Sequence, residues 1–267
     1  MSYKIKHMGL GGILDQAIAL LRDHFLLLFT IMLILVVPAA LVQGFLTPAL
    51  PAQPTPQDYA RFSDAYSRYW PVLGVLWVLE FVVLFPLANA AVIQAVARLY
   101  LGQPITALEA ISHGARRLPA LLGTSILMYL AIWGGFLLFI IPGIYFAIWF
   151  GLSQHVVVIE GLAGSAAMKR SKQLVHKDRG TFLAIGIVLI VISMLIGGGM
   201  GLIPQPAIKI AASALVQALT TVLWTAALVV FYFSCRCNVE NFDLHYLAES
   251  IGAEPAEGEP LPSTVRT

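Results

Sequence analysis

Long runs of apolar residues alternate along the chain with short polar connections. Crossing the roughly 30 Å hydrocarbon core of a bilayer takes about 20 apolar helical residues. Six stretches reach or approach this length, so the pattern predicts an all-α integral membrane protein with six transmembrane helices. The predicted spans cover residues 25–46, 71–97, 119–141, 143–159, 181–203 and 207–234.

Proline and glycine separate the spans that follow one another closely. Pro142 and Gly143 divide one long uncharged stretch, because this dipeptide is typical of turns. The Pro-Gln-Pro sequence at residues 204–206 separates the last two spans, because proline can continue neither helix. The span at 143–159 is at the short limit, and the pattern leaves open whether it crosses the membrane fully or re-enters.

An amphipathic segment precedes three of the spans. Apolar residues recur at helical spacing over residues 10–21, Thr106 and Glu109 form a predicted capping box, and residues 165–177 combine one apolar face with basic side chains. Each of these helices is expected to lie at the membrane interface. We therefore interpret residues 1–251 as a single six-helix domain made of three repeats of interfacial helix plus helical hairpin. Simple alternation of loops and spans is the alternative.

Positive charge gathers on one side of the predicted spans. Of 16 Lys and Arg residues, twelve fall on the side of the N-terminus, three on the opposite side and one in the tail. The twelve are Lys4, Lys6, Arg22, Arg98, Arg116, Arg117, Lys169, Arg170, Lys172, Lys177, Arg179 and Arg236; the three are Arg61, Arg68 and Lys209. Because basic loops remain cytoplasmic, both termini are predicted to be cytoplasmic. The Pro- and Glu-rich tail, residues 252–267, is expected to be disordered.

The overall composition agrees with a multi-pass protein of the bacterial plasma (inner) membrane. Hydrophobic residues make up 59% of the 267 residues and charged residues only 11%, whereas a typical soluble domain has about 25% charged residues. This excludes a water-soluble globular protein. The net charge of +2 gives no indication of nucleic acid as a partner.

A few polar residues lie within the predicted spans. Glu80 is the one formal charge deep in a span, and an intramembrane carboxylate is a candidate functional residue. On the last span Lys209, Gln217 and Thr220 form a polar stripe, with Gln217 at about the depth of Glu80. Further polar groups nearer the cytoplasmic half are Asn89, Gln94 and His155. These residues predict a small intramembrane polar site, or hydrogen bonds between helices, which are the commoner use of such groups.

Two further surfaces follow from the spacing of small and basic residues. Glycines at positions 197, 198, 199 and 201 predict a close approach between helices or a kink. Basic residues before the fifth span are candidate contacts for anionic lipid headgroups, at about 1 kcal/mol for each charge near the surface. These candidates are Lys169, Arg170, Lys172, Lys177 and Arg179.

Signatures of catalysis are missing from the sequence. It contains no Ser/His/Asp arrangement, no phosphate-binding glycine loop, no HExxH helix and no pair of carboxylates on one span. Cys235, Cys237 and His245 do not match a strong zinc pattern. We predict no catalytic, cofactor-binding or metal-binding residue, and no enzymatic activity.

Short motifs along nearly the whole chain resemble a known family. Residues 11–17 (Gly-Gly-Ile-Leu-Asp-Gln-Ala), 22–25 (Arg-Asp-His-Phe), 140–145 (Ile-Ile-Pro-Gly-Ile-Tyr) and 242–249 (Phe-Asp-Leu-His-Tyr-Leu-Ala-Glu) are similar to the glycerophosphodiester phosphodiesterase membrane-domain family. Residues 156–161 and 168–171 also resemble YciC-type small inner-membrane proteins. The resemblance implies a six-helix bacterial membrane protein without the hydrolase domain, because the His-Arg dipeptide typical of that enzyme is absent. It implies no established activity.

The sequence thus favours a non-enzymatic accessory or interaction module whose basic interfacial helices contact anionic lipid. Its expected partners are membrane lipid and an unidentified membrane protein. The alternative is a small-solute or lipid transporter with a midplane polar site around Glu80.

Overall fold

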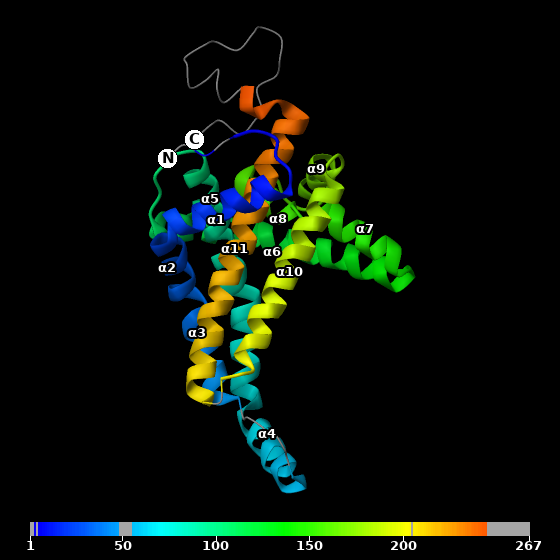
Figure 1. The fold of residues 1–267 in the computed structure, drawn as a ribbon. Coiled ribbons are helices and arrows are strands. Elements are labelled where there is room, and N and C mark those ends of the chain that lie inside the picture. Colours follow the sequence, from blue (N-terminus) through cyan, green and yellow to red (C-terminus); the bar gives the residue numbers. More distant parts are fainter. Residues whose placement is uncertain (1–2, 4, 48–54, 204, 245–267) are drawn as a thin grey trace.

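Helices make up the secondary structure of the part of the chain that the computed structural model describes, residues 3, 5–47, 55–203 and 205–244 (Figure 1). This confirms the predicted all-α class. The tail at 252–267 lies outside the described residues. The helices are α1 (Leu10–Asp23), α2 (Phe25–Leu35), α3 (Val37–Leu46), α4 (Pro56–Leu79), the π-helix η1 (Glu80–Leu84), α5 (Phe85–Tyr100), α6 (Ala107–Leu138), α7 (Ile140–Phe150), α8 (Ser153–Ile159), α9 (Ser165–Val175), α10 (Arg179–Met200) and α11 (Pro206–Glu240).

Five helical segments of the described chain are long and apolar enough to cross a membrane, which is typical of a multi-pass membrane protein. They are Pro56–Tyr100, Ala107–Leu138, Ile140–Ile159, Arg179–Met200 and Pro206–Glu240. A sixth is reached if α1 and α2, which meet at 78°, are counted as one bent span.

The predicted first span, residues 25–46, is divided between α2 and α3. The division falls at Val36, two residues before Pro38. Proline has no backbone N–H to donate to the preceding turn, and its ring collides with the carbonyl four residues earlier. The apolar stretch is therefore continuous in sequence but not in helical structure.

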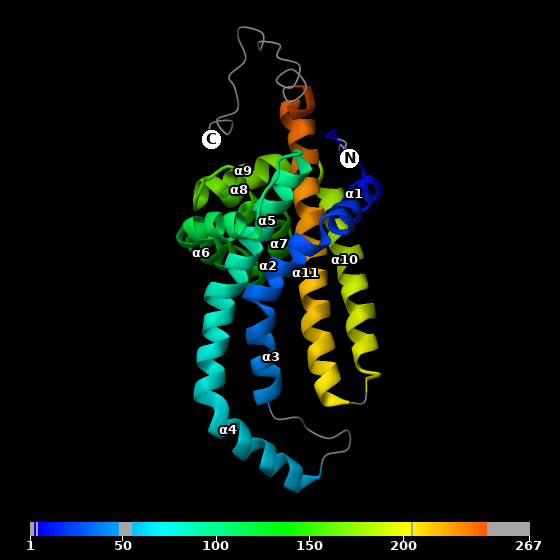
Figure 2. The ribbon, with the colours of Figure 1, turned by 90° about the vertical axis from the view of Figure 1, so that its left-hand side faces the viewer.

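Two ends of the molecule differ in how tightly they are packed (Figures 1 and 2). We call the packed end the region formed by α1, α5, α8, α9 and residues 225–240 of α11, where most side chains of α5 and α11 are buried. We call the open end the region formed by α3, α4, residues 190–200 of α10 and residues 206–224 of α11. There Leu73 is the one buried residue of α4, and Val37 the one buried residue of α3. Figure 2 shows these open-end helices extending beyond the packed end.

The segment before α1 is attached to α11 at the packed end. The backbone N–H of Met8 donates to the Ser234 hydroxyl over 2.9 Å, and that hydroxyl also lies 3.3 Å from the Met8 carbonyl. Ser234 is almost completely buried. These contacts join residues more than 200 positions apart, so the two ends of the described chain belong to one packed unit.

The hairpin of α6 and α7 projects sideways from α10 and α11 rather than running alongside them (Figure 1). Its turn is at Phe139, which is extended (φ −162°, ψ 154°), and not at the predicted Pro142–Gly143. Pro142 falls within the first turn of α7, where a backbone N–H is not required for helical hydrogen bonding. Gly143 instead allows close packing, because a Cβ on Gly135 would lie 3.0 Å from the Gly143 Cα.

The three predicted repeats are not equivalent in the structure. A helix, a break and a second helix occur at α1–α2 and at α9–α10. The middle unit lacks the break, because α6 runs from Ala107 through Pro119 to Leu138. Helices in membranes tolerate an internal proline when neighbouring groups satisfy the freed carbonyl. The predicted interfacial helix before residue 119 and the predicted span after it are therefore one helix.

The predicted capping box at the start of α6 is confirmed. Thr106 Oγ1 accepts from the Glu109 N–H over 3.3 Å, and the Glu109 carboxylate accepts from the Thr106 N–H over 2.9 Å. These two bonds satisfy donors that a helix start otherwise leaves free. By contrast Gly164 precedes the first residue of α9, and no side chain caps that helix.

Candidate functional site

Glu80 forms a hydrogen bond with a residue outside the predicted polar site. The Gln43 side chain of α3 donates to Glu80 Oε2 at the start of η1. Gln217 and Lys209 lie exposed on α11, and no hydrogen bond or ion pair joins them to Glu80 in the described part of the chain. The predicted grouping of Glu80, Gln217 and Lys209 is therefore not formed. A usable signal was present, because Gln43 is the only carboxamide in residues 25–46.

Four helices share a hydrogen-bonded chain of neutral polar side chains in the interior. Asn89 of α5 donates to Gln154 of α8 over 3.0 Å and accepts from Thr225 of α11 over 3.0 Å. Gln154 in turn donates to Ser125 of α6 over 3.2 Å. Every contact in this chain joins different helices, so Asn89 serves helix association, as polar residues in membranes commonly do.

Two further predicted intramembrane polar residues, Thr220 and His155, have no interhelical partner of this kind within the described chain. Thr220 donates to the carbonyls of its own helix at Val216 (2.9 Å) and Gln217 (3.0 Å). His155 is 4% exposed, and neither ring nitrogen has a hydrogen-bond partner. The residues of the described chain contain no group of three His, Cys, Asp or Glu side chains that could hold a metal ion.

A buried cluster of four alternating charges lies at the packed end. Arg170 of α9 pairs with Glu160, at the end of α8, over 2.9 Å, and also with Glu240 of α11. Glu240 pairs with Arg236 over 2.9 Å, and the Tyr232 hydroxyl donates to Glu160 over 2.6 Å. The side chains of Glu160 and Arg236 are 6% and 3% exposed. This ion-pair cluster joins α8, α9 and α11.

The pKa values of the cluster follow from these contacts. Burial alone lowers the pKa of Arg170, but the ion pairs with Glu160 and Glu240 outweigh it and leave the pKa above its usual range. Burial alone raises the pKa of Glu240, whereas its bonds to Arg236 and Arg170 leave it below its usual range. Both side chains are therefore held in their charged forms.

The five predicted headgroup contacts of the basic segment do not share one role. Arg170 lies in the ion-pair cluster, and this corrects its prediction as a lipid contact. The reason is its position beside Ala167, Ser171 and Leu174, which form the buried face of α9. Lys172 Nζ lies 4.1 Å from the centre of the Trp149 ring. The remaining three residues are Lys169 and Lys177, which are exposed, and Arg179, which donates to the His176 carbonyl over 2.9 Å.

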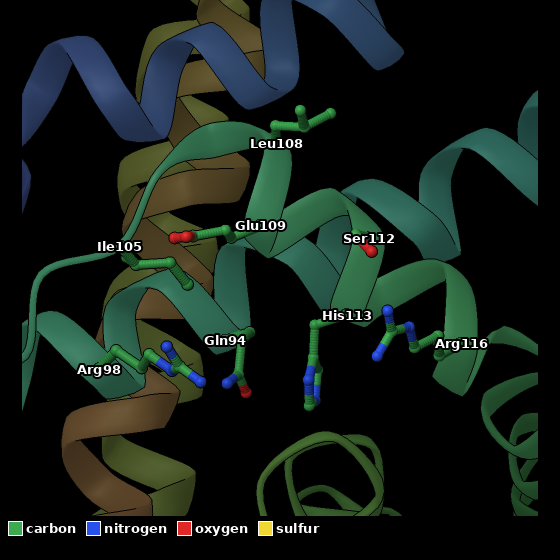
Figure 3. A pocket seen from close by; sticks show the side chains of 8 residues that line it. All are labelled: Gln94, Arg98, Ile105, Leu108, Glu109, Ser112, His113 and Arg116. Atoms are coloured by element: carbon green, nitrogen blue, oxygen red, sulfur yellow. The ribbon is translucent and has the colours of Figure 1, made fainter. Parts of the chain in front are cut away.

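A hollow of about 460 Å³ opens between α5 and α6 at the packed end (Figure 3). Gln94 and Arg98 come from α5, one helical turn apart, and Ser112, His113 and Arg116 come from α6. The rest of the lining consists of Ile105, Leu108 and Glu109. Figure 3 shows Arg98 and Arg116 on either side of Gln94 and His113, with these four side chains directed toward the same space. We call it the arginine hollow.

His113 is held neutral within this basic surrounding. Its Nε2 lies 3.3 Å from the Val158 carbonyl. Burial is the largest cause lowering its pKa; the hydrogen bond to Val158 opposes this, and Arg117, Arg98 and Arg116 lower the pKa further. Three guanidinium groups thus act on one imidazole, which shows that positive charge is concentrated here.

In the sequence pattern, Arg98 and Arg116 contribute only to the charge bias. The signal that could have brought them together is the short connection at residues 101–106, which places the end of α5 beside the start of α6. Ion pairs across the packed end had no comparable signal, because Glu160, Arg170 and Glu240 are separated by 10 and 70 residues.

The family described as "Domain of unknown function (DUF8558)" matches residues 119–265, which is more than half of the chain. The chain therefore belongs to this family. No match was found among curated proteins or among solved structures. The resemblance to the glycerophosphodiester phosphodiesterase membrane-domain family stays a prediction.

Proposed function

We propose that this member of the DUF8558 family is a non-enzymatic accessory or interaction module of the bacterial plasma membrane, with its packed end facing the cytoplasm and contacting anionic lipid. The supporting observation is the distribution of exposed basic side chains. Those at or beside the packed end are Lys6, Arg22, Arg98, Arg116, Lys169, Lys172 and Lys177, and those at the open end are Arg61, Arg68 and Lys209. The charge bias of the sequence is therefore also a bias of the folded surface.

The attraction between these basic side chains and an anionic leaflet is large enough to contribute to membrane binding. Each Lys or Arg near an anionic leaflet contributes about 1 kcal/mol, and the effect decays within a Debye length of about 10 Å at 0.1 M salt. Basic loops are also retained on the cytoplasmic side. The same residues therefore support both the orientation and the lipid contact.

The topology proposed with this orientation has six membrane-embedded segments in three hairpins. The sideways course of the α6–α7 hairpin (Figure 1) favours a middle pair that enters and leaves on the cytoplasmic side. If the middle pair crosses the membrane fully, the chain has six full crossings; if it re-enters, the chain has four. Both numbers are even, so both topologies keep the two termini on the same side of the membrane. A cysteine at Phe139, in the turn, separates them: an impermeant thiol reagent added outside cells labels it only if the middle pair crosses fully.

Lipid selectivity of the full chain tests the proposed function. In vesicles that mix phosphatidylglycerol with phosphatidylcholine, electron paramagnetic resonance of spin-labelled lipid reports which lipid is immobilised on the protein. We expect preference for phosphatidylglycerol that declines as salt increases. The triple variant Lys169→Gln, Lys172→Gln, Lys177→Gln should lose part of this preference, whereas Lys→Arg at the same positions should keep it. Equal immobilisation of both lipids by the wild type would contradict the proposal.

A transporter is the second candidate function, and the Glu80–Gln43 pair favours it. An intramembrane carboxylate is expensive to bury and commonly marks an ion or proton path. This carboxylate also begins a π-helix, a feature frequent at functional sites. Because the arginine hollow is not lined by Glu80, this candidate rests on the pair alone.

A further inference from the structure

Gln94 is a mostly buried residue whose carboxamide is open to the arginine hollow. It is only 9% exposed, yet no hydrogen bond to its side chain occurs within the described residues. The amide atoms themselves are reached by solvent, so they can donate to and accept from a ligand that enters the hollow. Figure 3 shows its amide directed into the arginine hollow, between Arg98 and His113.

The charged groups at the edge of the hollow are also available. Arg98 and Arg116 are exposed, and neither side chain makes a hydrogen bond or ion pair in the described part of the chain. The one carboxylate of the lining belongs to Glu109, which accepts from the Thr106 N–H and is near enough to Arg98 for the two charges to attract each other, without forming an ion pair. Two guanidinium groups therefore face the hollow against one carboxylate that is already hydrogen-bonded.

The donors in the hollow fit a tetrahedral oxyanion. Guanidinium groups bind phosphate oxygens with two parallel N–H donors, and a carboxamide and a hydroxyl add single donors. Here Arg98, Arg116, Gln94 and Ser112 supply these groups from two adjacent helices. The volume of about 460 Å³ lies within the range of small-molecule sites.

The level of the hollow agrees with the position of lipid phosphates. Arg98 directly follows the predicted span 71–97, and Arg116 lies three residues before the predicted span 119–141. Both side chains are thus expected where hydrocarbon gives way to headgroups. We infer that the arginine hollow binds one phosphate group, carried by a lipid headgroup or by a free phosphate. This inference deepens the proposed function, because it assigns a defined site on the surface proposed to contact anionic lipid.

Calorimetric titration of the full chain in a phosphate-free maltoside detergent tests the site. The two probes are short-chain phosphatidic acid and inorganic phosphate. We expect one equivalent of at least one probe to bind wild-type protein. Arg98→Gln and Arg116→Gln should each weaken binding about tenfold or more, since hydrogen bonds between charged groups are lost. Gln94→Leu should weaken it severalfold, and Arg68→Gln, which alters an exposed arginine of the open end, should leave it unchanged.

The two probes identify the source of the phosphate. Tighter binding of phosphatidic acid indicates a lipid headgroup, and equal or tighter binding of inorganic phosphate indicates a free phosphate. Absence of one-site binding for both probes, or equal binding by wild type, Arg98→Gln and Arg116→Gln with unchanged thermal stability, would overturn the inference. The proposed function fails separately, because it depends on lipid selectivity through Lys169, Lys172 and Lys177, which do not line the hollow.

Discussion

The two halves of α11 have similar apolar composition but opposite surroundings. From Thr225 to Cys237 every side chain is buried, including Arg236, whereas residues 206–224 bury only Ala214, Ala218 and Val222. Hydropathy does not distinguish a helix face that contacts lipid from one that is buried in protein, because lipid tails and a protein core are both apolar surroundings for leucine. The comparison indicates that the packed end holds the fold together and that the open end is adapted to lipid.

Breaking the ion-pair cluster of the packed end should cause the largest loss of stability. Glu160→Ala leaves the buried Arg170 with Glu240 alone and removes the acceptor of the Tyr232 hydroxyl. Loss of one partner from a buried pair costs about 3 kcal/mol. Denaturant-induced unfolding of the purified protein measures this loss. The control is Asp64→Ala, because Asp64 is an exposed carboxylate of the open end; an equal effect of both variants would contradict the assignment.

Two leucines of α11, one in each half, allow a comparison of the same substitution in the two surroundings, with a smaller expected effect on stability. Leu228 is 9% exposed and Leu215 is 40% exposed. Leu228→Ala should destabilise the protein by about 2 kcal/mol, because it leaves a cavity among packed side chains. Leu215→Ala should destabilise the protein by much less than Leu228→Ala, since lipid fills the space that the side chain leaves. The same unfolding assay applies, and equal losses would show that both halves are packed alike.

Substitutions of Glu80 should have the smallest effect on stability, and they distinguish the two candidate functions. Glu80→Gln keeps a polar partner for Gln43 and should change stability little, whereas Glu80→Leu should cost about 0.6 kcal/mol, as interhelical hydrogen bonds in membranes do. If Glu80 instead carries a proton in transport, Glu80→Gln should fold normally and lose proton-dependent uptake in proteoliposomes. Unchanged function in that variant would remove the proton-coupled transporter.

Local signals in the sequence predicted local structure well. The Thr106–Glu109 box caps α6 as expected, because both partners lie within one helical turn. The turn predicted at Pro142–Gly143 exists but is displaced to Phe139, since proline is accepted in the first turn of a helix. Helix caps and turns depend on residues that are close in sequence, so a sequence pattern can predict them.

Contacts between distant segments could not be predicted in this way. The glycines at 197, 198 and 199 have nothing within 4 Å of an added Cβ, so the predicted close approach is not formed there within the described chain, and its alternative, a kink, stays a prediction. Close approaches occur instead at Gly44 against Ile210 and at Gly151 against Phe182. Likewise, Glu80 pairs with Gln43 rather than Gln217, because the choice among polar partners is made by helix arrangement.

The central claim is that the packed end faces the cytoplasm and the open end faces outward. Impermeant thiol labelling in intact cells tests it directly with two single-cysteine additions, Lys169→Cys on α9 and Ser63→Cys on α4, both at exposed positions. The native Cys235 and Cys237 are buried, and burial raises the pKa of the Cys235 thiol, so wild-type protein should give little background. We expect labelling of Ser63→Cys from outside and of Lys169→Cys only after the membrane is permeabilised. The reverse pattern would contradict it.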